Sequence, residues 1–406
     1  MDRNYPKVFV SPKAERSLRG GHPWVYSEEI IDVSGIPIDG ELVDVLSNKQ
    51  KYLGTGFFNS NSKIRVRIIS RNTNDKFDRA FYERRIRYAL QYRKSVMAEE
   101  GFSCCRLIFG EADCFPGFTV DRFNDVLVTQ VLSLGIEKIK DTLYELLVQE
   151  LEKMGEKISA IYERNDVKIR TLEGMEMYKG FWNGLRTDLS GITTITENGL
   201  KFSVDYINGQ KTGFFLDQKY NRAAIRRIAK GRTVLDCFTH TGAFALNAAA
   251  AGAKHVNAVD ISDEAIKMTK DNANLNGLTE NMEFTCANVF DLLTDLYKSC
   301  KSPYDFIILD PPAFTKSKST VKDAFRGYKE INLKAMRLLN RGGYLATCSC
   351  SHFMTESLFK QMLHDAAEDA GVSLRQIESR RQSPDHPILW NVPETDYLKF
   401  FIFQVV

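Results

Sequence analysis

The sequence of 406 residues lacks any apolar run near the ~18 residues that a membrane-spanning helix requires, because charged residues interrupt every candidate. The charged N-terminal residues 1–6 are not followed by an apolar segment, so no secretory signal is expected there. Hydrophobic residues make up 43% of the chain and charged residues 26%, as in globular proteins. We therefore expect a cytoplasmic enzyme without a membrane partner. A chain of this length predicts two or three domains.

The sequence also lacks a Cys-x-x-Cys pair and any cluster of histidines, which argues against a structural zinc site, and no metal is expected. Without a secretory signal, its cysteines need no disulfide framework. Most of them are expected to be small buried hydrophobic residues. The eight cysteines are Cys104, Cys105, Cys114, Cys237, Cys286, Cys300, Cys348 and Cys350.

A strong net charge is missing as well, since the total is +3, but the charge is unevenly distributed. The first hundred residues contain 18 Lys and Arg residues against 13 Asp and Glu residues. A modestly basic N-terminal part is compatible with a module that binds a polyanion such as a nucleic acid. An uneven solvated surface would give the same count.

Short β-rich segments dominate the first 72 residues and predict a small barrel or sheet. Arg65 and Arg67 alternate with apolar residues, which predicts an electropositive outer side of this sheet. Gly20 to Trp24 should form a tight loop that presents an aromatic ring. The predicted strands are 8–10, 41–46, 52–58 and 64–69, with a helical turn over 14–18.

Residues 73–198 mix helical and strand patterns, and residues 199–406 alternate buried apolar strands with helices as a parallel α/β sheet requires. The fold class is therefore α/β, with a central α+β part. In the central part we expect helices 79–100 and 138–154 and strands 106–109, 118–122, 126–132 and 160–163. In the last part we expect strands 233–237, 255–260, 282–286, 304–310, 343–348 and 397–404 and helices 242–252 and 263–276.

A ligand site is predicted where the strand 233–237 passes through a small-residue turn into an Ala-rich helix. A dinucleotide site would need Gly-x-Gly-x-x-Gly, but only Gly242 is present in this turn, which argues against a nicotinamide-dependent dehydrogenase. Asp236 would repel a phosphate but can hold the ammonium of an amino acid. Asp260, at the next strand end, can accept the hydroxyls of a ribose. The pattern favours a nucleoside with an amino-acid tail.

A second candidate site is Asp310-Pro-Pro-Ala-Phe314, which follows an apolar strand. The two prolines stiffen the backbone and fix where Asp310 and Phe314 project. An aromatic ring beside a carboxylate suits a flat heterocycle, because the ring stacks while the carboxylate bonds its polar edge.

Together, residues 236–242, Asp260, residues 310–314 and Thr347-Cys-Ser-Cys-Ser351 resemble the class I methyltransferases that modify ribosomal RNA. Within them, the chain resembles the large-subunit 23S rRNA cytosine-C5 methyltransferase family over its whole length. Residues 11–26 match the opening of that family's PUA domain, and residues 208–219 match the segment that closes over the cofactor. The resemblance implies a PUA-like domain over 1–72, a central domain over 73–198 and a Rossmann-like catalytic domain over 199–406.

The resemblance implies S-adenosylmethionine as cofactor and ribosomal RNA as partner, and a homodimer is compatible with it. It assigns Cys350 as a nucleophile that adds to carbon 6 of cytosine, with Asp310 stabilising charge on the base; Cys348 is the rival nucleophile. The cofactor site would comprise Thr212, Phe215, Asp236, Phe238, Thr239, Thr241, Gly242, Asp260, Ile261, Asn288 and Asp310. The RNA-binding candidates are Phe314, Arg19, His22, Trp24, Arg65 and Arg67.

The sequence departs from the wider group of RNA cytosine-C5 enzymes at Pro311-Pro312-Ala313, where many of them place a second cysteine. The group that releases the product is therefore left open. Two alternatives also stay open: a guanine N7, guanine N2 or adenine N6 methyltransferase without a covalent intermediate, and an RNA-binding protein with a degenerate catalytic domain.

Overall fold

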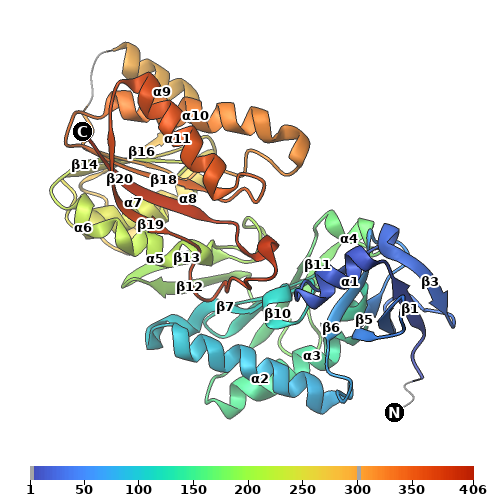
Figure 1. The fold of residues 1–406 in the computed structure, drawn as a ribbon. Coiled ribbons are helices and arrows are strands. Elements are labelled where there is room, and N and C mark those ends of the chain that lie inside the picture. The colour runs from blue at the N-terminus through green and yellow to red at the C-terminus, as the bar shows by residue number, and fades with distance from the viewer. Residues whose placement is uncertain (1–3, 300–302) are drawn as a thin grey trace. The chain divides into compact units, whose positions relative to one another are not determined.

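The structure is a computed structural model that describes residues 4–299 and 303–406 (Figure 1). Cys300 therefore lies outside the described residues, and so do residues 1–3 of the N-terminal segment 1–6. The chain forms two compact units. The first unit comprises Met1–Ile195, Val204–Leu216 and Pro384–Thr395, and the second comprises Thr196–Ser203, Asp217–Ser383 and Asp396–Val406. Within the described ranges, no helix is both long enough and apolar enough to cross a membrane.

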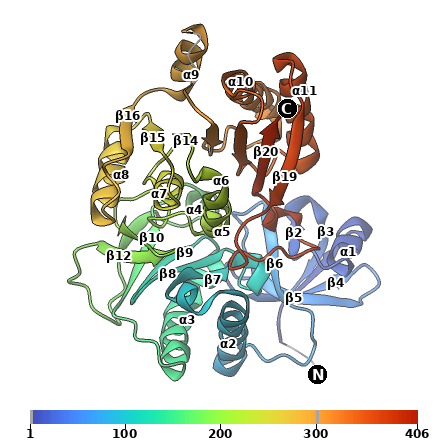
Figure 2. The same cartoon turned by 90° about the vertical axis from the view of Figure 1, so that its left-hand side faces the viewer.

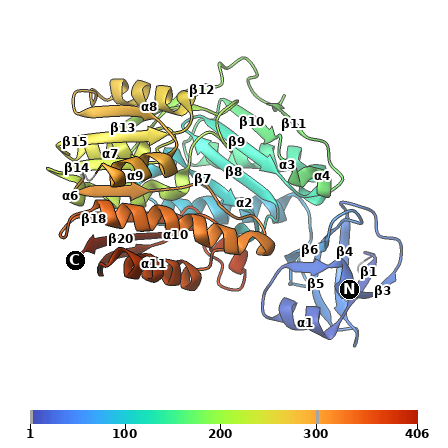
Figure 3. The same cartoon turned by 90° about the horizontal axis from the view of Figure 1, so that it is seen from above.

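The N-terminal sheet of the first unit has six strands in the order β2-β6-β5-β4-β1-β3 (Figure 3). Valine side chains such as Val8, Val25 and Val45 are fully buried in its core. Strands β2 and β3 were not predicted, since β2 is short and most of β3 is exposed and lacks alternation. The elements are β1 (Lys7–Val10), α1 (Pro12–Arg19), β2 (Trp24–Tyr26), β3 (Ile30–Ser34), β4 (Leu42–Ser47), β5 (Tyr52–Phe58) and β6 (Ile64–Ser70).

Arg67 on β6 does not lie on an electropositive outer face, so this expectation is wrong. Only 8% of Arg67 is exposed. Its guanidinium donates to Glu173 Oε1 at 2.8 Å and to Glu111 Oε1 at 3.5 Å. A guanidinium that leaves water needs carboxylate partners, and these come from distant parts of the chain that a local pattern does not reveal.

The second sheet of the first unit has the order β11-β10-β9-β8-β7, with α2 and α3 side by side against it (Figure 2). Helix α3 starts at Leu134, earlier than predicted, and α2 ends at Val96. The elements are α2 (Arg79–Val96), β7 (Cys104–Phe109), β8 (Phe118–Phe123), β9 (Val126–Val131), α3 (Leu134–Lys153), β10 (Ala160–Asn165), α4 (Ile169–Leu172) and β11 (Tyr178–Phe181). A two-stranded hairpin of β12 (Ile192–Glu197) and β13 (Leu200–Asp205) follows.

The second unit is built on a seven-stranded sheet in the order β16-β15-β14-β17-β18-β20-β19. Helices α5 to α8 lie on one face and α9 to α11 on the other (Figure 1). The elements are α5 (Lys219–Ala224), α6 (Arg226–Ala229), β14 (Thr233–Cys237), α7 (Ala243–Ala250), β15 (His255–Asp260), α8 (Asp263–Leu275), β16 (Met282–Cys286), α9 (Val289–Lys298), β17 (Phe306–Leu309), α10 (Val321–Leu338), β18 (Tyr344–Ser349), α11 (Glu356–Ala370), β19 (Leu374–Arg380) and β20 (Lys399–Val405).

This sheet is mixed rather than parallel, which corrects the prediction. Strands β14 to β18 are mutually parallel, but β20 runs antiparallel to β18 and to β19. A continuous apolar run such as β20 indicates burial on both faces but does not encode the direction of the strand. The order of the chain reverses between β14 and β17, and open α/β sheets bind their ligands at this kind of switch point.

The expectation that most cysteines are buried holds for Cys104, Cys105, Cys237 and Cys348. Cys114 and Cys286 are exposed instead. Cys350 is partly exposed, so it is the only thiol of intermediate exposure among the described cysteines.

Candidate active site

Two predicted motifs meet at the carboxyl edge of the sheet because β14 and β17 are neighbours. Cys237 pairs with Leu309 across these parallel strands, so Asp236 and Asp310 stand close to the same edge. The Asp310 amide donates to the Cys237 carbonyl at 3.4 Å. The loop over 238–242 and the loop over 310–314 therefore start side by side.

Asp236 is fully buried beneath the first of these loops. Its Oδ2 accepts hydrogen bonds from Thr239 Oγ1 at 2.6 Å and from the Ala245 amide at 2.9 Å, which holds the start of α7. Its Oδ1 is buried without a protein partner. Burial, together with the nearby charges of Asp310 and Asp260, raises the pKa of Asp236 to about 7, although the hydrogen bonds from Thr239 and Ala245 act in the opposite direction.

The loop after Asp236 has an unusual backbone. Phe238 and His240 have φ values of 64° and 52°, in the left-handed region that side chains with a Cβ seldom occupy. Such backbone conformations persist only where the surrounding structure enforces them, and they cluster at functional sites. Here Asp260 Oδ2 accepts a hydrogen bond from the His240 amide at 3.0 Å, and Thr269 Oγ1 donates to the His240 carbonyl at 3.0 Å.

Gly242 ends this loop with a φ of 80°. A Cβ at this position would lie 2.5 Å from Thr269 Cγ2 and 2.8 Å from Leu246 Cδ1. Glycine is therefore required here both for its backbone conformation and for the close approach of α8.

Asp260 and Ile261 follow β15 and are suited to a nucleoside. The Asp260 carboxylate is partly exposed, and each oxygen accepts one backbone amide, which leaves lone pairs for further donors. The Ile261 side chain is 69% exposed, an apolar surface beside the carboxylate. Asn288 is the N-cap of α9, and its Oδ1 accepts a hydrogen bond from the Phe290 amide at 2.9 Å.

Asp310 is tied to elements that the sequence motif does not include. Its Oδ1 accepts a hydrogen bond from Gln218 Nε2 at 3.0 Å. Burial and the charge of Asp217 raise the pKa of Asp310 to about 6, although the Arg222 guanidinium lowers it. Arg222 is itself held by a bidentate pair with Glu197, at 2.6 and 2.8 Å. Near neutral pH this carboxyl group can therefore donate or accept a proton.

The two candidate thiols on β18 have different environments. Cys348 is fully buried within the sheet and contacts Asp310 and Gln218, and burial raises the pKa of its thiol well above the ordinary value. Cys350 lies just beyond the strand and is partly exposed. Since a nucleophile must reach its substrate as a thiolate, Cys350 is the better placed of the two.

Tyr328 of α10 holds the residues on both sides of Cys350. Its buried hydroxyl accepts a hydrogen bond from Ser349 Oγ at 3.1 Å and shares one with Ser351 Oγ at 3.0 Å. Burial raises the pKa of Tyr328 to about 12, so the hydroxyl stays protonated. The ring of Phe314 packs on Tyr328 with centroids 4.5 Å apart, which links the Asp-Pro-Pro-Ala-Phe motif to this segment.

Lys399 of β20 lies beneath the same segment and is 3% exposed. Its Nζ donates to the Ser351 carbonyl at 2.7 Å and to the Tyr397 carbonyl at 2.8 Å. Within the part of the chain that the structure describes, no carboxylate forms an ion pair with it. Burial lowers the pKa of Lys399 to about 8, while the nearby Cys350 acts in the opposite direction.

Several predicted residues lie in the first unit. Thr212 is buried and donates to Asp121 Oδ2 at 2.6 Å, and Phe215 lies 4.6 Å from Lys211 Nζ. Arg19 is paired with Glu15. Among the remaining RNA-binding candidates, His22 contacts Glu394, Trp24 donates to Glu111, and Arg65 donates to the Asn59 carbonyl.

Sequence reasoning missed Gln218, Tyr328 and Lys399. Gln218 lies inside the motif over 208–219, so that motif was a usable signal. Tyr328 lies within an ordinary amphipathic helix and Lys399 begins a strand that was expected to be parallel. Only the folded arrangement brings them to Cys350.

Comparisons with known proteins place this geometry among methyltransferases. Residues 106–404 match a family model described as S-adenosylmethionine-dependent methyltransferase, and residues 8–71 match a PUA-like domain. The chain is 43% identical to the ribosomal RNA large subunit methyltransferase I of Shewanella denitrificans over 401 residues, which is 98% of this chain and 99% of that protein. It is 39% identical over 406 residues to the protein of the same name from Klebsiella pneumoniae, with complete coverage of both.

Solved structures show the same fold at lower identity. A Streptococcus mutans protein assigned as a SAM-dependent methyltransferase has a TM-score of 0.81 at 23% identity, over 98% of this chain and 100% of the other. A protein assigned as a methyltransferase and crystallised with SAH has a TM-score of 0.82 at 23% identity and the same coverage.

We predict that Gly242→Ala destabilises the protein more than Gly231→Ala. Both glycines have positive φ, but a Cβ at Gly231 meets nothing within 4 Å. The Gly231 variant should lose about 1–2 kcal/mol in the free energy of unfolding from backbone strain. The Gly242 variant should lose about 1–3 kcal/mol more from overpacking. Urea unfolding followed by circular dichroism measures both, and equal losses would contradict the required close approach of α8.

We also predict that Asp236 makes the folded protein less stable as the pH rises. Because its pKa in the folded state is about 7 against 3.8 in the unfolded chain, the folded state binds this proton more tightly. Its contribution is greatest below pH ~4 and is lost as the pH approaches ~7. In Asp236→Asn, the decline in the free energy of unfolding between pH ~4 and ~7 should be smaller by on the order of 2–4 kcal/mol. Urea unfolding at a series of pH values across this range measures the difference. An unchanged pH profile would show that Asp236 is ionised normally.

Proposed function

The chain belongs to the ribosomal RNA large subunit methyltransferase I family, whose catalytic part is an S-adenosylmethionine-dependent methyltransferase, and we propose that it methylates carbon 5 of a cytosine in 23S rRNA. The rRNA substrate is proposed from the names of relatives about 40% identical over the full chain. The observation that carries the choice of carbon 5 is the accessible thiol of Cys350 at the edge of the sheet that also bears Asp310. We further propose that the protein acts on rRNA in the cytoplasm.

The residues at the switch point fit the cofactor. Asp260 has free lone pairs for the ribose hydroxyls, and the exposed Ile261 side chain offers an apolar surface to the adenine. The buried Oδ1 of Asp236 would be satisfied by one more donor, from a ligand or a water molecule. When bound, S-adenosylmethionine supplies an electrophilic methyl group on a sulfonium.

Carbon 5 of cytosine is a poor nucleophile, so the enzyme must first activate the ring. The Cys350 thiolate adds to carbon 6, and the electron pair of the C5–C6 double bond moves to carbon 5, which can then take the methyl group. Loss of the proton from carbon 5 restores the double bond and expels the thiolate. The protein thereby ends in its starting form, and the proton passes to a base.

The surroundings of Cys350 support this role. Tyr328 fixes the serine on each side of the thiol, which restricts the direction of attack. The Lys399 ammonium donates to the carbonyl of Ser351, the residue after Cys350, so its charge can stabilise a thiolate there, and no carboxylate of the described chain forms an ion pair with it. Asp310, with a pKa near 6, can hold the polar edge of cytosine as donor or acceptor.

A second candidate function follows from the Asp310-Pro-Pro-Ala-Phe314 motif. This motif also resembles that of enzymes that methylate exocyclic amines, and a guanine or adenine nitrogen attacks the methyl group directly. Such a reaction needs no thiol, so Cys350 separates the two functions.

We predict that Cys350→Ala lowers methyl transfer to 23S rRNA by at least about 10³-fold, because carbon 5 is then not activated. Cys348→Ala is the matched control, and it should retain activity within about tenfold, since this thiol is buried. Transfer is measured with radiolabelled cofactor, and calorimetry with S-adenosylmethionine checks that both variants keep the cofactor site. Undiminished transfer by Cys350→Ala would favour the nitrogen-methylating reaction, and loss only in Cys348→Ala would make Cys348 the nucleophile.

A further inference from the structure

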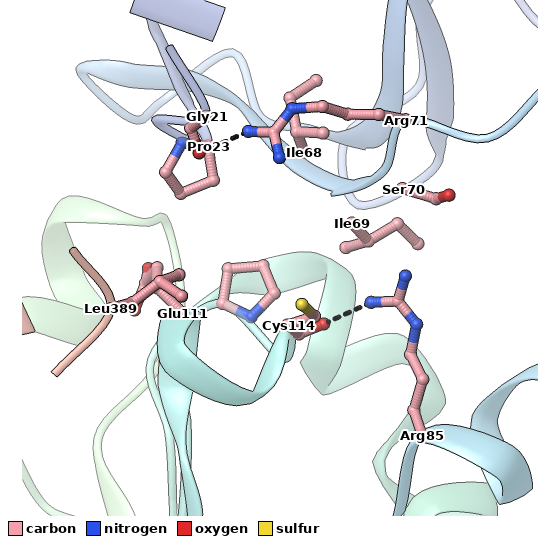
Figure 4. A pocket seen from close by; sticks show the side chains of 11 residues that line it. Gly21, Pro23, Ile68, Ile69, Ser70, Arg71, Arg85, Glu111, Cys114 and Leu389 are labelled. Carbon is pink, nitrogen blue, oxygen red and sulfur yellow. Dashed lines mark hydrogen bonds between the residues drawn. The ribbon is translucent and has the colours of Figure 1, made fainter. Parts of the chain in front are cut away.

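A pocket of about 120 Å³ in the first unit carries two arginines that the proposed mechanism does not use (Figure 4). Arg71 follows β6 and Arg85 belongs to α2. Figure 4 shows the Arg71 side chain on the side of Gly21 and Pro23 and the Arg85 side chain on the side of Cys114. The pocket thus lies where the N-terminal sheet and the second sheet of the first unit meet.

Within the described part of the chain, the hydrogen bonds of both guanidinium groups go to backbone carbonyls. Arg71 donates to the carbonyls of Gly21 at 2.5 Å and His22 at 3.2 Å. Arg85 donates to the Cys114 carbonyl at 3.1 Å and stacks on the Phe81 ring at 4.3 Å. These contacts fix the direction of each side chain but neutralise neither charge.

Buried and half-buried arginines of the same unit differ from Arg71 and Arg85 in their partners. Arg93, Arg106 and Arg170 each form an ion pair with a carboxylate, at 2.5, 2.7 and 3.0 Å. Within the described residues, neither Arg71 nor Arg85 has such a partner, although Arg85 is partly buried and burial lowers its pKa. A partly buried cation without a counter-ion is costly, and this makes the pocket favourable for an anion.

The acidic groups near the pocket are already engaged. Glu111 lines it, but its Oε1 accepts hydrogen bonds from Trp24 Nε1 at 3.0 Å and from Arg67 at 3.5 Å. Asp75 is paired with Arg84 at 3.4 Å and accepts a hydrogen bond from Ser70 Oγ at 2.6 Å. The charge of Asp75 acts on Arg85 from a distance, but within the described residues no carboxylate forms an ion pair with Arg71 or Arg85, so both guanidinium groups can pair with a ligand.

We propose that Arg71 and Arg85 bind a phosphodiester group of the RNA substrate in this pocket. This inference rests on the proposed function, since it takes RNA as the substrate. Planar guanidinium groups match the oxygens of a phosphate and remain charged at all physiological pH values. Apolar walls from Pro23, Ile68 and Pro116 suit the ribose beside the phosphate. Contacts of this kind position a strand without reading its sequence.

The test compares Arg71→Gln, Arg85→Gln and the double variant in the full-length protein with Arg79→Gln. Arg79 is the matched control, because it lies on the same helix as Arg85, is exposed, and pairs with Glu145 outside the pocket. The probe is a transcript of 23S rRNA, and its affinity is measured by filter binding over a series of salt concentrations. Inorganic phosphate is added as a competitor in a second series.

We expect each single variant to weaken RNA binding about threefold to tenfold, and to reduce the slope of log affinity against log salt by about 1. Arg79→Gln should keep the wild-type slope, and phosphate should compete with RNA only when both arginines are present. Wild-type affinity in the single and double variants, or an equal loss in Arg79→Gln, would overturn the proposal. Phosphate binding that depends on the arginines without any change in RNA affinity would overturn the RNA assignment.

Calorimetry with S-adenosylmethionine separates this proposal from the proposed function. All pocket variants should bind the cofactor as the wild type does, and should reach the wild-type rate of methyl transfer at saturating RNA. A wild-type protein that binds RNA through these arginines but transfers no methyl group to 23S rRNA would contradict the proposed function and leave the phosphate site standing.

Discussion

The reversal of strand order between β14 and β17 is the constraint on which the candidate site depends. It brings the carboxylates of Asp236 and Asp310 to the same sheet edge, where burial raises the pKa of both and the charge of Asp310 adds to the rise at Asp236. Hydrogen-bond donors around the two carboxyl groups offset this electrostatic cost. Thr239 and the start of α7 hold Asp236, and Gln218 holds Asp310. A site of this kind favours a ligand that brings hydrogen-bond donors and no phosphates.

Strand β18, the next strand of the sheet, places the Cys350 thiol at the same edge. Because β18 lies beside β17 and runs parallel to it, Cys350 and Asp310 lie at the same edge of the sheet, although 40 residues separate them in sequence. Tyr328 comes from the helix that connects these strands, and Lys399 comes from the antiparallel strand on the other side. The thiol of Cys350, the proposed nucleophile, is therefore positioned by elements from both sides of β18. The proposed reaction requires a precise position of the thiol, and the contacts of Tyr328 and Lys399 on either side of β18 provide it.

Much of this arrangement was predictable from the sequence, for physical reasons that can be named. The strands over 233–237, 255–260 and 282–286 have the predicted bounds, because each is a short apolar or β-branched run between turn residues. The edge strand β19 was not predicted, since it is largely exposed and polar. The direction of β20 and the burial of Arg67 depend on partners far away in sequence. The same holds for Tyr328 and Lys399, whose roles exist only in the folded chain.

The central claim is that Cys350 forms a covalent bond to carbon 6 of the target cytosine, and trapping of that bond tests it most directly. A 23S rRNA transcript that carries 5-fluorocytosine has no removable proton at carbon 5, so methylation would leave the thiol attached. With S-adenosylmethionine present, the wild-type protein and Cys348→Ala should form an RNA adduct that survives denaturing electrophoresis, and Cys350→Ala should form none. An adduct in Cys350→Ala, or none in the wild type while the normal transcript is methylated, would contradict the account.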